Sequence, residues 1–167
     1  MRTNLRLLVV LVVASALGIV SIASAGGGAG ERHKKVRIIE LRSVTVQSAD
    51  LDLGTAGFTV GDRFVFSDDV FQGDRQVGTL GGECTTVRIL PQPLPAGQEP
   101  TSVTVQCLVS TQLPRGQLTA QGLVTFDEGP FTLAITGGTG AYRTAHGEAR
   151  VTEVSETEAN IRVKLIR

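Results

Sequence analysis

The feature that most constrains this chain is an alternation of apolar and polar side chains with a period of two, which recurs after Lys35 between turns rich in glycine and proline. Such alternation is typical of β-strands that pack one face on a core and expose the other to solvent. No segment after Lys35 has the spacing of an amphipathic helix, so the predicted fold class is all-β. The expected strands are 36–46, 62–71, 83–90, 101–111, 117–126, 131–136, 145–153 and 159–166.

The connections between these segments favour an antiparallel arrangement. Most are short, and the exceptions are a glycine-containing loop over 49–61 and a loop over 91–97 that holds three prolines. Eight antiparallel strands form either a two-sheet sandwich or a closed barrel. We expect the eight-stranded antiparallel barrel, because closure leaves no unpaired edge. A barrel of this size has room inside for side chains or one small ligand, so a pocket is expected in the lumen.

The amino-terminal region differs from the rest of the chain. Residues 1–25 have the pattern of a signal peptide, with Arg2 and Arg6 before an apolar run over 7–20 and Ala23-Ser24-Ala25 at the cleavage position. An uncleaved membrane anchor is the alternative, since the apolar run is nearly long enough to span a bilayer. Residues 26–35 read as a flexible linker and 36–167 as the barrel domain. We therefore expect a secreted, extracellular protein that leaves the membrane after cleavage.

Composition excludes several function classes. The 16 lysines and arginines balance 16 aspartates and glutamates, which argues against nucleic-acid binding because that needs clustered positive charge. The only histidines are His33 and His146, too few for a site built from several histidine ligands. No metal and no dissolved cofactor is predicted.

The two cysteines, Cys84 and Cys107, lie in neighbouring expected strands. If Leu90 pairs with Thr101 across the proline loop, then Cys84 falls opposite Cys107 at a cross-strand spacing that suits a disulfide. Export to an oxidising compartment favours the bond. Free thiols are the alternative, and in that case Cys84 becomes a reactive group.

Three polar positions are candidates for chemistry. Asp68 alternates with Phe64 and Phe66 and so faces the lumen if they do, although a solvated aspartate near a strand end is equally consistent. Glu40 shares a strand face with Arg42, and the pair needs buried partners only if that face points inward. His146 has the chemistry of a general base, but an exposed strand histidine is the more common outcome.

The segment Ile135 to Tyr142 starts like a dinucleotide-binding fingerprint after a strand. The position of the third glycine is Arg143, and the following residues are strand-like rather than helical. The glycines are therefore interpreted as a tight turn between strands.

Three stretches resemble the allene oxide cyclase and dirigent barrel superfamily, most closely its exported bacterial members. The stretch over 131–143 is the most specific, since it contains the glycines of 137–140 and continues into Ala145-His146-Gly147-Glu148. The stretches are 61–69 (GDRFVFSDD), 81–87 (GGECTTV) and 131–143 (FTLAITGGTGAYR).

The resemblance implies an eight-stranded barrel with an apolar lumen, assembled as a homodimer or homotrimer, that steers ring closure or coupling of a small molecule by holding its shape. It places Asp68 and Glu40 at the positions of catalytic or polar pocket residues, but Arg42 stands where an asparagine is expected. The match therefore favours a related reaction over allene oxide cyclisation itself. The residues expected to contact the ligand are Phe64, Phe66, Cys84, Arg88, Val105 and Phe126.

The first functional hypothesis is a secreted barrel that binds a small, largely apolar organic molecule and steers its cyclisation, isomerisation or coupling. In it, Asp68 and Arg88 orient the ligand if both face inward. The second hypothesis is a non-catalytic extracellular barrel used for structure or interaction, which predicts a lumen filled by side chains.

Overall fold

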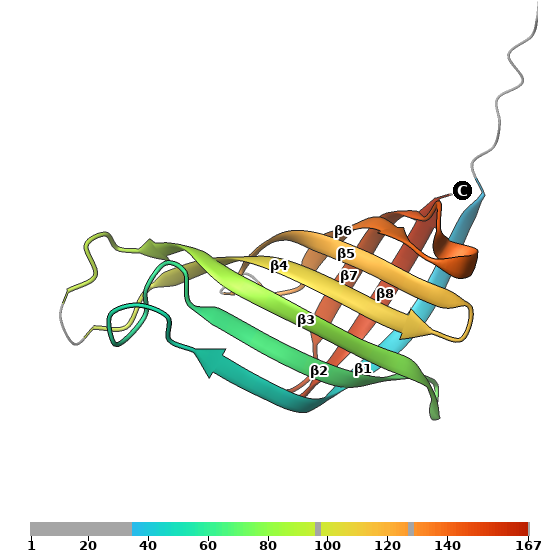
Figure 1. Ribbon diagram of the computed structural model, residues 1–167, viewed down its shortest axis with the longest axis horizontal. Helices are drawn as coiled ribbons and strands as arrows, with labels where there is room; N and C mark the ends of the chain where they lie inside the picture. The colour runs from blue at the N-terminus through green and yellow to red at the C-terminus, as the bar shows by residue number, and fades with distance from the viewer. Residues whose placement is uncertain (1–34, 96–97, 127–128, 167) are drawn as a thin grey trace, which may run out of the picture. The chain divides into compact units, whose positions relative to one another are not determined.

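The computed structural model describes residues 35–95, 98–126 and 129–166, and these form a closed antiparallel β-barrel in which each strand pairs with its neighbours in sequence (Figure 1). The predicted signal peptide and all but the last residue of the predicted linker lie outside the described residues. The elements are β1 (Val36–Leu51), β2 (Arg63–Gln72), β3 (Arg75–Leu90), β4 (Ser102–Leu113), β5 (Gly116–Thr125), β6 (Phe131–Gly138), the 3₁₀ turn η1 (Gly140–Tyr142), β7 (His146–Glu153) and β8 (Glu158–Ile166).

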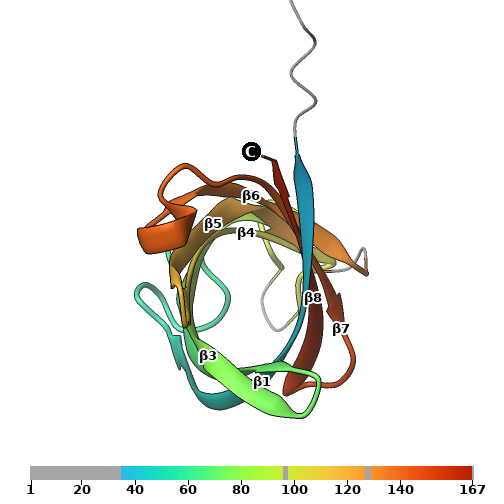
Figure 2. The same ribbon diagram turned by 90° about the vertical axis from the view of Figure 1, so that its right-hand side faces the viewer.

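Pairing between the first and last strands closes the ring. The register runs from Val36 opposite Ile166 to Val44 opposite Glu158, and the view along the barrel shows β1 beside β8 (Figure 2). The expected fold class is confirmed. In the described part of the chain, no helix has both the length and the apolar character needed to cross a bilayer.

The alternation seen in the sequence is the inside–outside pattern of the barrel. On β8, Ile161, Val163 and Leu165 are buried while Arg162 and Lys164 are exposed. The same pattern on the other strands produces one continuous apolar core inside the ring. Burial of this surface is the main stabilising contribution to such a fold.

Strand β3 begins earlier than predicted, at Arg75 rather than 83. The predicted start is too late, because the prediction interprets Gly81 and Gly82 as the opening of the strand. They lie inside it, where a Cβ atom on Gly82 would stand 2.6 Å from the Cζ of Phe66. The missing side chain at Gly82 makes room for the Phe66 ring, so this glycine serves packing inside the strand.

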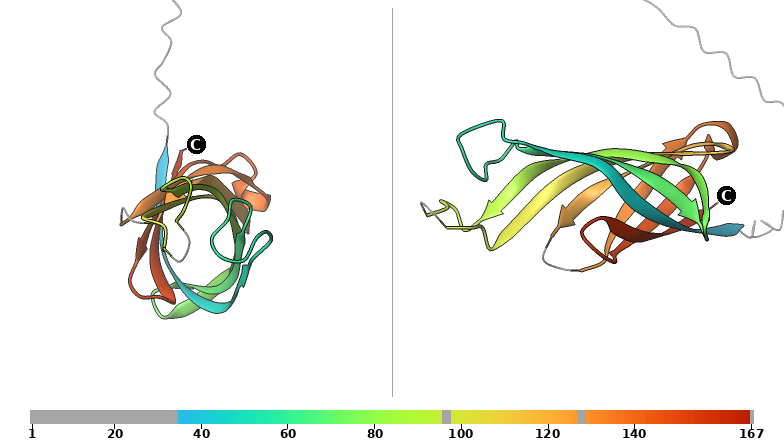
Figure 3. Two further views of the ribbon diagram at one scale, coloured as in Figure 1. Left: turned by 90° about the vertical axis from the view of Figure 1, so that its left-hand side faces the viewer. Right: turned by 90° about the horizontal axis from the view of Figure 1, so that it is seen from below.

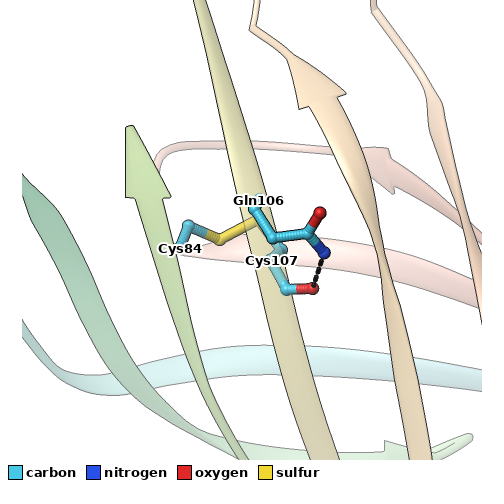
Figure 4. The surroundings of a disulfide bond; sticks show 3 residues. All are labelled: Cys84, Gln106 and Cys107. Carbon is cyan, nitrogen blue, oxygen red and sulfur yellow. Dashed lines mark hydrogen bonds between the residues drawn. A yellow bond between two sulfur atoms is a disulfide. The ribbon is translucent and has the colours of Figure 1, made fainter. Parts of the chain in front are cut away.

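The predicted pairing of Cys84 with Cys107 is confirmed, and the two residues form a disulfide. Figure 4 shows the bond between β3 and β4, with the Gln106 side-chain amide donating to the Cys107 carbonyl oxygen at 3.3 Å. Leu90 pairs with Ser102 instead of Thr101. A register shift between Thr86 and Arg88 displaces the pairing by one residue from Arg88 to Leu90. The reactive-thiol interpretation of Cys84 is therefore wrong, since both cysteines are bonded.

The two ends of the barrel differ. The long β1–β2 and β3–β4 loops extend from one end (Figure 3), and strand order places the β5–β6 and β7–β8 connections at that same end. The tight β2–β3 and β4–β5 turns and η1 lie at the other end (Figure 1). We call the end with the long loops the mouth and the opposite end the base.

We expect the disulfide to stabilise the barrel. The bond spans 23 residues, and a loop of this length corresponds to about 3 kcal/mol in the chain-entropy account. The double variant Cys84→Ala/Cys107→Ala should lower the free energy of unfolding by this amount in urea denaturation. Reductant should destabilise the unmodified protein and leave the variant unchanged. Equal stabilities of the two proteins without reductant would contradict the assignment.

Candidate functional site

A cavity of about 240 Å³ occupies the barrel interior, lined by residues of all eight strands. Its wall is mainly aliphatic and aromatic and includes the buried Cys84–Cys107 disulfide. The polar groups that line it below the mouth are Ser43, Thr45, Asp68 and Thr111. The cavity lies near the lower size limit of small-molecule pockets and shares their composition, with apolar walls and few polar groups.

Strand β2 orders the site from mouth to base. Its inward residues are Phe64, Phe66, Asp68 and Val70, in that sequence along the strand. The rings of Phe64 and Phe66 stack with centroids 5.4 Å apart and planes 18° from parallel. Asp68 therefore lies deeper than both rings, and Val70 beyond it is fully buried.

Side chains fill the base. Ile39, Leu113 and Leu165 join Val70 in the core cluster, and none of them lines the cavity. Leu113 lies at the tight β4–β5 turn, and Leu165 pairs with Gly147 at the start of β7. The cavity is consequently a blind chamber that opens at the mouth.

Asp68 is the buried charged side chain of the chamber, with 6% of its surface exposed. Thr45 is its partner residue across the β1–β2 ladder, and Ser43 lies one inward position closer to the base. Burial raises the pKa of the Asp68 carboxyl group above its usual value, and the neighbouring hydroxyl groups of Thr45 and Ser43 oppose this shift only in part. Its Oδ1 atom has no hydrogen-bond partner.

An unpaired buried polar atom costs free energy in the fold, so a protein that keeps one carries a group available to a ligand. Protonated, the Asp68 carboxyl group is a hydrogen-bond donor at the end of an apolar channel. Ionised, it is an acceptor and a counter-ion. It can take either role toward a molecule that fills the chamber.

Acidic side chains surround the mouth. Glu153 and Glu156 line the chamber at the β7–β8 connection. A second, more open cavity of about 680 Å³ lies under the β1–β2 and β3–β4 loops and shares Phe64, Cys84 and Phe126 with the chamber. Its acidic lining residues are Asp50, Asp52, Asp62 and Glu99.

Hydrogen bonds fix Asp62 at this entrance. Its carboxylate accepts bonds from the backbone N–H groups of Thr59, at 2.7 Å, and Leu53, at 3.1 Å. These bonds lower the pKa of Asp62 below its usual value, with the Thr59 backbone as the largest cause. Asp62 therefore orders the β1–β2 loop and keeps a negative charge at the mouth.

The structure brings together Phe64, Phe66, Asp68, Cys84 and Phe126 of the predicted site residues, all of which line the chamber. Phe126 is at its rim, with 55% of its surface exposed. Val105 is buried and lines the second cavity rather than the chamber.

Glu40 and Arg88 lie outside the chamber. Glu40 is exposed between the buried Ile39 and Leu41, and it forms an ion pair with Arg162 of β8 at 3.5 Å on the outer face. Arg88 is exposed just after the register shift in β3. Both side chains would have to face inward to act on a ligand in the lumen, and neither does.

His146 is also exposed, and its ring nitrogen lies 3.4 Å from the Thr144 carbonyl oxygen. Sequence reasoning missed Ser43 and Thr45, which lie beside Asp68, and the acidic mouth. The alternation of Ser43 and Thr45 with Val44 contained the signal for the first two, but only the register with β2 places them against the carboxyl group.

The glycine signature of 137–140 builds the base. A Cβ atom on Gly138 would stand 2.2 Å from the Gln117 carbonyl oxygen, and one on Gly140 would stand 2.4 Å from the Arg115 carbonyl oxygen. Thr139 donates its backbone N–H to Gln117 at 2.9 Å. The signature therefore packs η1 against the β4–β5 turn, consistent with its interpretation as a turn.

The sequence model of the family described as "Allene oxide cyclase barrel like domain" matches residues 42–165. Among solved structures, a protein named "Pyocyanin demethylase" is 32% identical, with a TM-score of 0.67, and the match covers 77% of this chain and 99% of that one. No curated protein matches the chain significantly.

Two more distant structures share the fold. An exo-specific intermolecular Diels-Alderase, AbnU, is 15% identical with a TM-score of 0.61, over 80% of this chain and 99% of that one. The pterocarpan synthase dirigent protein GePTS1 is also 15% identical with a TM-score of 0.61, over 90% of this chain and 99% of that one. At this identity the likeness concerns the barrel itself.

The raised pKa of Asp68 predicts a pH-dependent effect of the variant Asp68→Asn on stability. Well below the ordinary value of 3.8, the carboxyl group is protonated in both the folded and the unfolded protein, so its burial carries no ionisation penalty. As pH rises from 3.8 to the raised folded pKa, the unfolded protein ionises while the folded protein resists ionisation, so the folded protein loses stability until pH exceeds the folded pKa. At pH 7 the variant should therefore be more stable than the unmodified protein by about 1 kcal/mol.

Urea denaturation between pH 3 and pH 8 measures this difference. Asp69→Asn is the matched control, because Asp69 is the next residue and its carboxylate accepts a bond from the Gln76 side-chain amide outside the chamber. A stability difference for Asp68→Asn that is the same at pH 3 and pH 7 would contradict the assigned shift.

Proposed function

Because the chain belongs to the allene oxide cyclase-like barrel family, we propose that it binds a small, largely apolar organic molecule in its chamber and steers a rearrangement of that molecule. The observation that carries the proposal is the apolar cavity of about 240 Å³, which contains the buried Asp68 carboxyl group with an Oδ1 atom that has no hydrogen-bond partner. A barrel that serves only as a scaffold gains nothing from leaving this volume open, since unfilled core space reduces stability.

The walls supply binding and shape selection. Phe64 and Phe66 present stacked rings, and the facing strands contribute branched and small side chains such as Val124, Leu133 and Ala149. Transfer of an apolar ligand from water into this lining is favourable by about 25 cal/mol for each Å² of apolar surface removed from water. The ligand is thereby held in one conformation with its polar end toward Asp68.

Confinement lowers the barrier of a reaction in which a flexible molecule must fold on itself, because the entropy of reaching the reactive geometry is lost on binding. Asp68 adds a proton donor or acceptor where the chamber excludes water. Cyclisation, isomerisation and coupling are the reaction types that this arrangement suits. The names of the similar structures support the same range, and the 32% identical relative adds removal of a methyl group as a reaction to examine, with pyocyanin as the first compound.

The proposal includes export to the extracellular space. The signal-like residues 1–25 support it, and the disulfide between β3 and β4 is compatible with an oxidising compartment. The second hypothesis, a non-catalytic barrel, requires a filled lumen. The open chamber favours the first hypothesis.

Binding in the chamber is tested with a neutral apolar fluorophore, N-phenyl-1-naphthylamine, whose emission rises on transfer from water to an apolar site. Ala149 faces the chamber and is 5% exposed, so Ala149→Phe should fill the cavity and weaken binding at least tenfold, equivalent to about 1.4 kcal/mol. Ala134→Phe is the control, because Ala134 is exposed on the outer face of β6.

Circular dichroism of both variants checks that the barrel is intact, and Ala120→Phe provides a second way to fill the chamber from β5. Unchanged affinity in both filled variants, or no binding by the unmodified protein, would refute the proposal that the chamber is a ligand site.

A further inference from the structure

The charged residues around the chamber are of one sign. The charged side chains that line it, among the described residues, are Asp68, Glu153, Glu156 and Glu158, and no lysine, arginine or histidine of that part of the chain does so. Glu158 is ion-paired with Arg42 at 3.2 Å. Glu153 and Glu156 form no ion pair within the described residues.

The second cavity extends this pattern around the mouth. Asp50, Asp52, Asp62 and Glu99 line it, and its one basic lining residue among those described is Arg63, which is paired with Glu83 at 3.6 Å. The chain as a whole has equal numbers of acidic and basic residues. The negative charge at the mouth therefore results from where the fold places acidic residues and not from an excess of them in the sequence. A molecule that approaches the chamber passes through a negative potential, which accelerates the entry of cations and opposes that of anions.

The charged residue inside the chamber is also acidic. Asp68 is more than nine-tenths buried, lines the chamber, and leaves its Oδ1 atom without a partner. The groups nearest to it across the β1–β2 and β2–β3 ladders are Thr45 and Leu80, so its own neighbours provide no positive charge. A cationic ligand would supply the missing partner, and the cost of burying the carboxyl group is already incurred when the protein folds.

The aromatic lining suits a cation as well. Phe64 and Phe66 lie between the mouth and Asp68 on β2, and Phe126 and Phe131 also line the chamber. A cation within about 6 Å of an aromatic ring centre is attracted by the negative face of the ring, most strongly where water is excluded. A delocalised positive charge on an aromatic ligand also loses less hydration on entry than a compact ammonium group does.

We propose that the chamber selects small aromatic cations, with the Asp68 carboxylate as their counter-ion and the acidic mouth as their route of entry. This inference rests on the proposed function, because it names the class of molecule that the same chamber takes. It adds a sign of charge to a site whose walls alone would accept any apolar molecule of the right size.

The test compares three fused-ring probes of similar shape and different charge: 10-methylacridinium, 9-methylanthracene and anthracene-9-carboxylate. Fluorescence titration of the unmodified protein at low ionic strength should give affinities in the order cation, neutral, anion. We expect the cation to bind roughly ten- to a hundred-fold more tightly than the neutral probe, the range for a charge-assisted contact. Its association rate should fall as salt is added, while that of the neutral probe should not.

Asp68→Asn should abolish the preference for the cation and keep the affinity for the neutral probe. Asp69→Asn removes the same charge from the adjacent position outside the chamber and should keep the preference. If the neutral probe binds and the cation binds no more tightly to the unmodified protein, the inference is wrong and the proposed function stands. If Asp68→Asn retains the preference, Asp68 is not the counter-ion. If no probe binds, the proposed function fails as well.

Discussion

Pairing between β1 and β8 is the interaction on which the remaining structure depends. It joins the two ends of the sheet, from Val36 opposite Ile166 to Val44 opposite Glu158. An open sheet of eight strands would have two unpaired edges and no enclosed side. Once the ring is closed, every strand has one face toward a shared interior, and a side chain's position along its strand decides whether it meets solvent or the lumen.

Within that interior, the role of a side chain depends on how far it lies from the mouth. Ile39, Val70, Leu113 and Leu165 fill the base and provide stability, while the residues nearer the mouth leave space. Asp68 lies where the two regions meet. It keeps a carboxyl group that the fold alone does not satisfy, which is a cost in stability at neutral pH and an advantage only if a ligand contacts it. Sites of this kind are where stability and function oppose each other.

The sequence was most informative where the period of two decides the outcome. The inward orientation of Asp68 with Phe64 and Phe66 and the pairing of Cys84 with Cys107 both follow from alternation and hairpin geometry. Glu40 alternates with the inward residues Ile39 and Leu41 and therefore faces outward, whereas the role that the resemblance assigns to it requires an inward side chain. A local resemblance carries less information about orientation than the burial of adjacent side chains does.

Other features could not be predicted from the sequence because they depend on contacts between distant segments. The register shift beside Arg88 and the close approach of Phe66 to Gly82 arise from the fit between strands. The acidic mouth combines loops that are far apart in the chain, and it becomes visible only when the ring brings 50–62, Glu99 and 153–156 to one end.

The filled base has a kinetic consequence. Because side chains fill the base, a product formed in the chamber would have to leave through the mouth, by which the next molecule arrives. Occupancy is then mutually exclusive, so a product that keeps the shape of its precursor would act as a competitive inhibitor. Turnover would then be limited by the rate of product release. A reaction that changes the shape or charge of the bound molecule would release its product fastest.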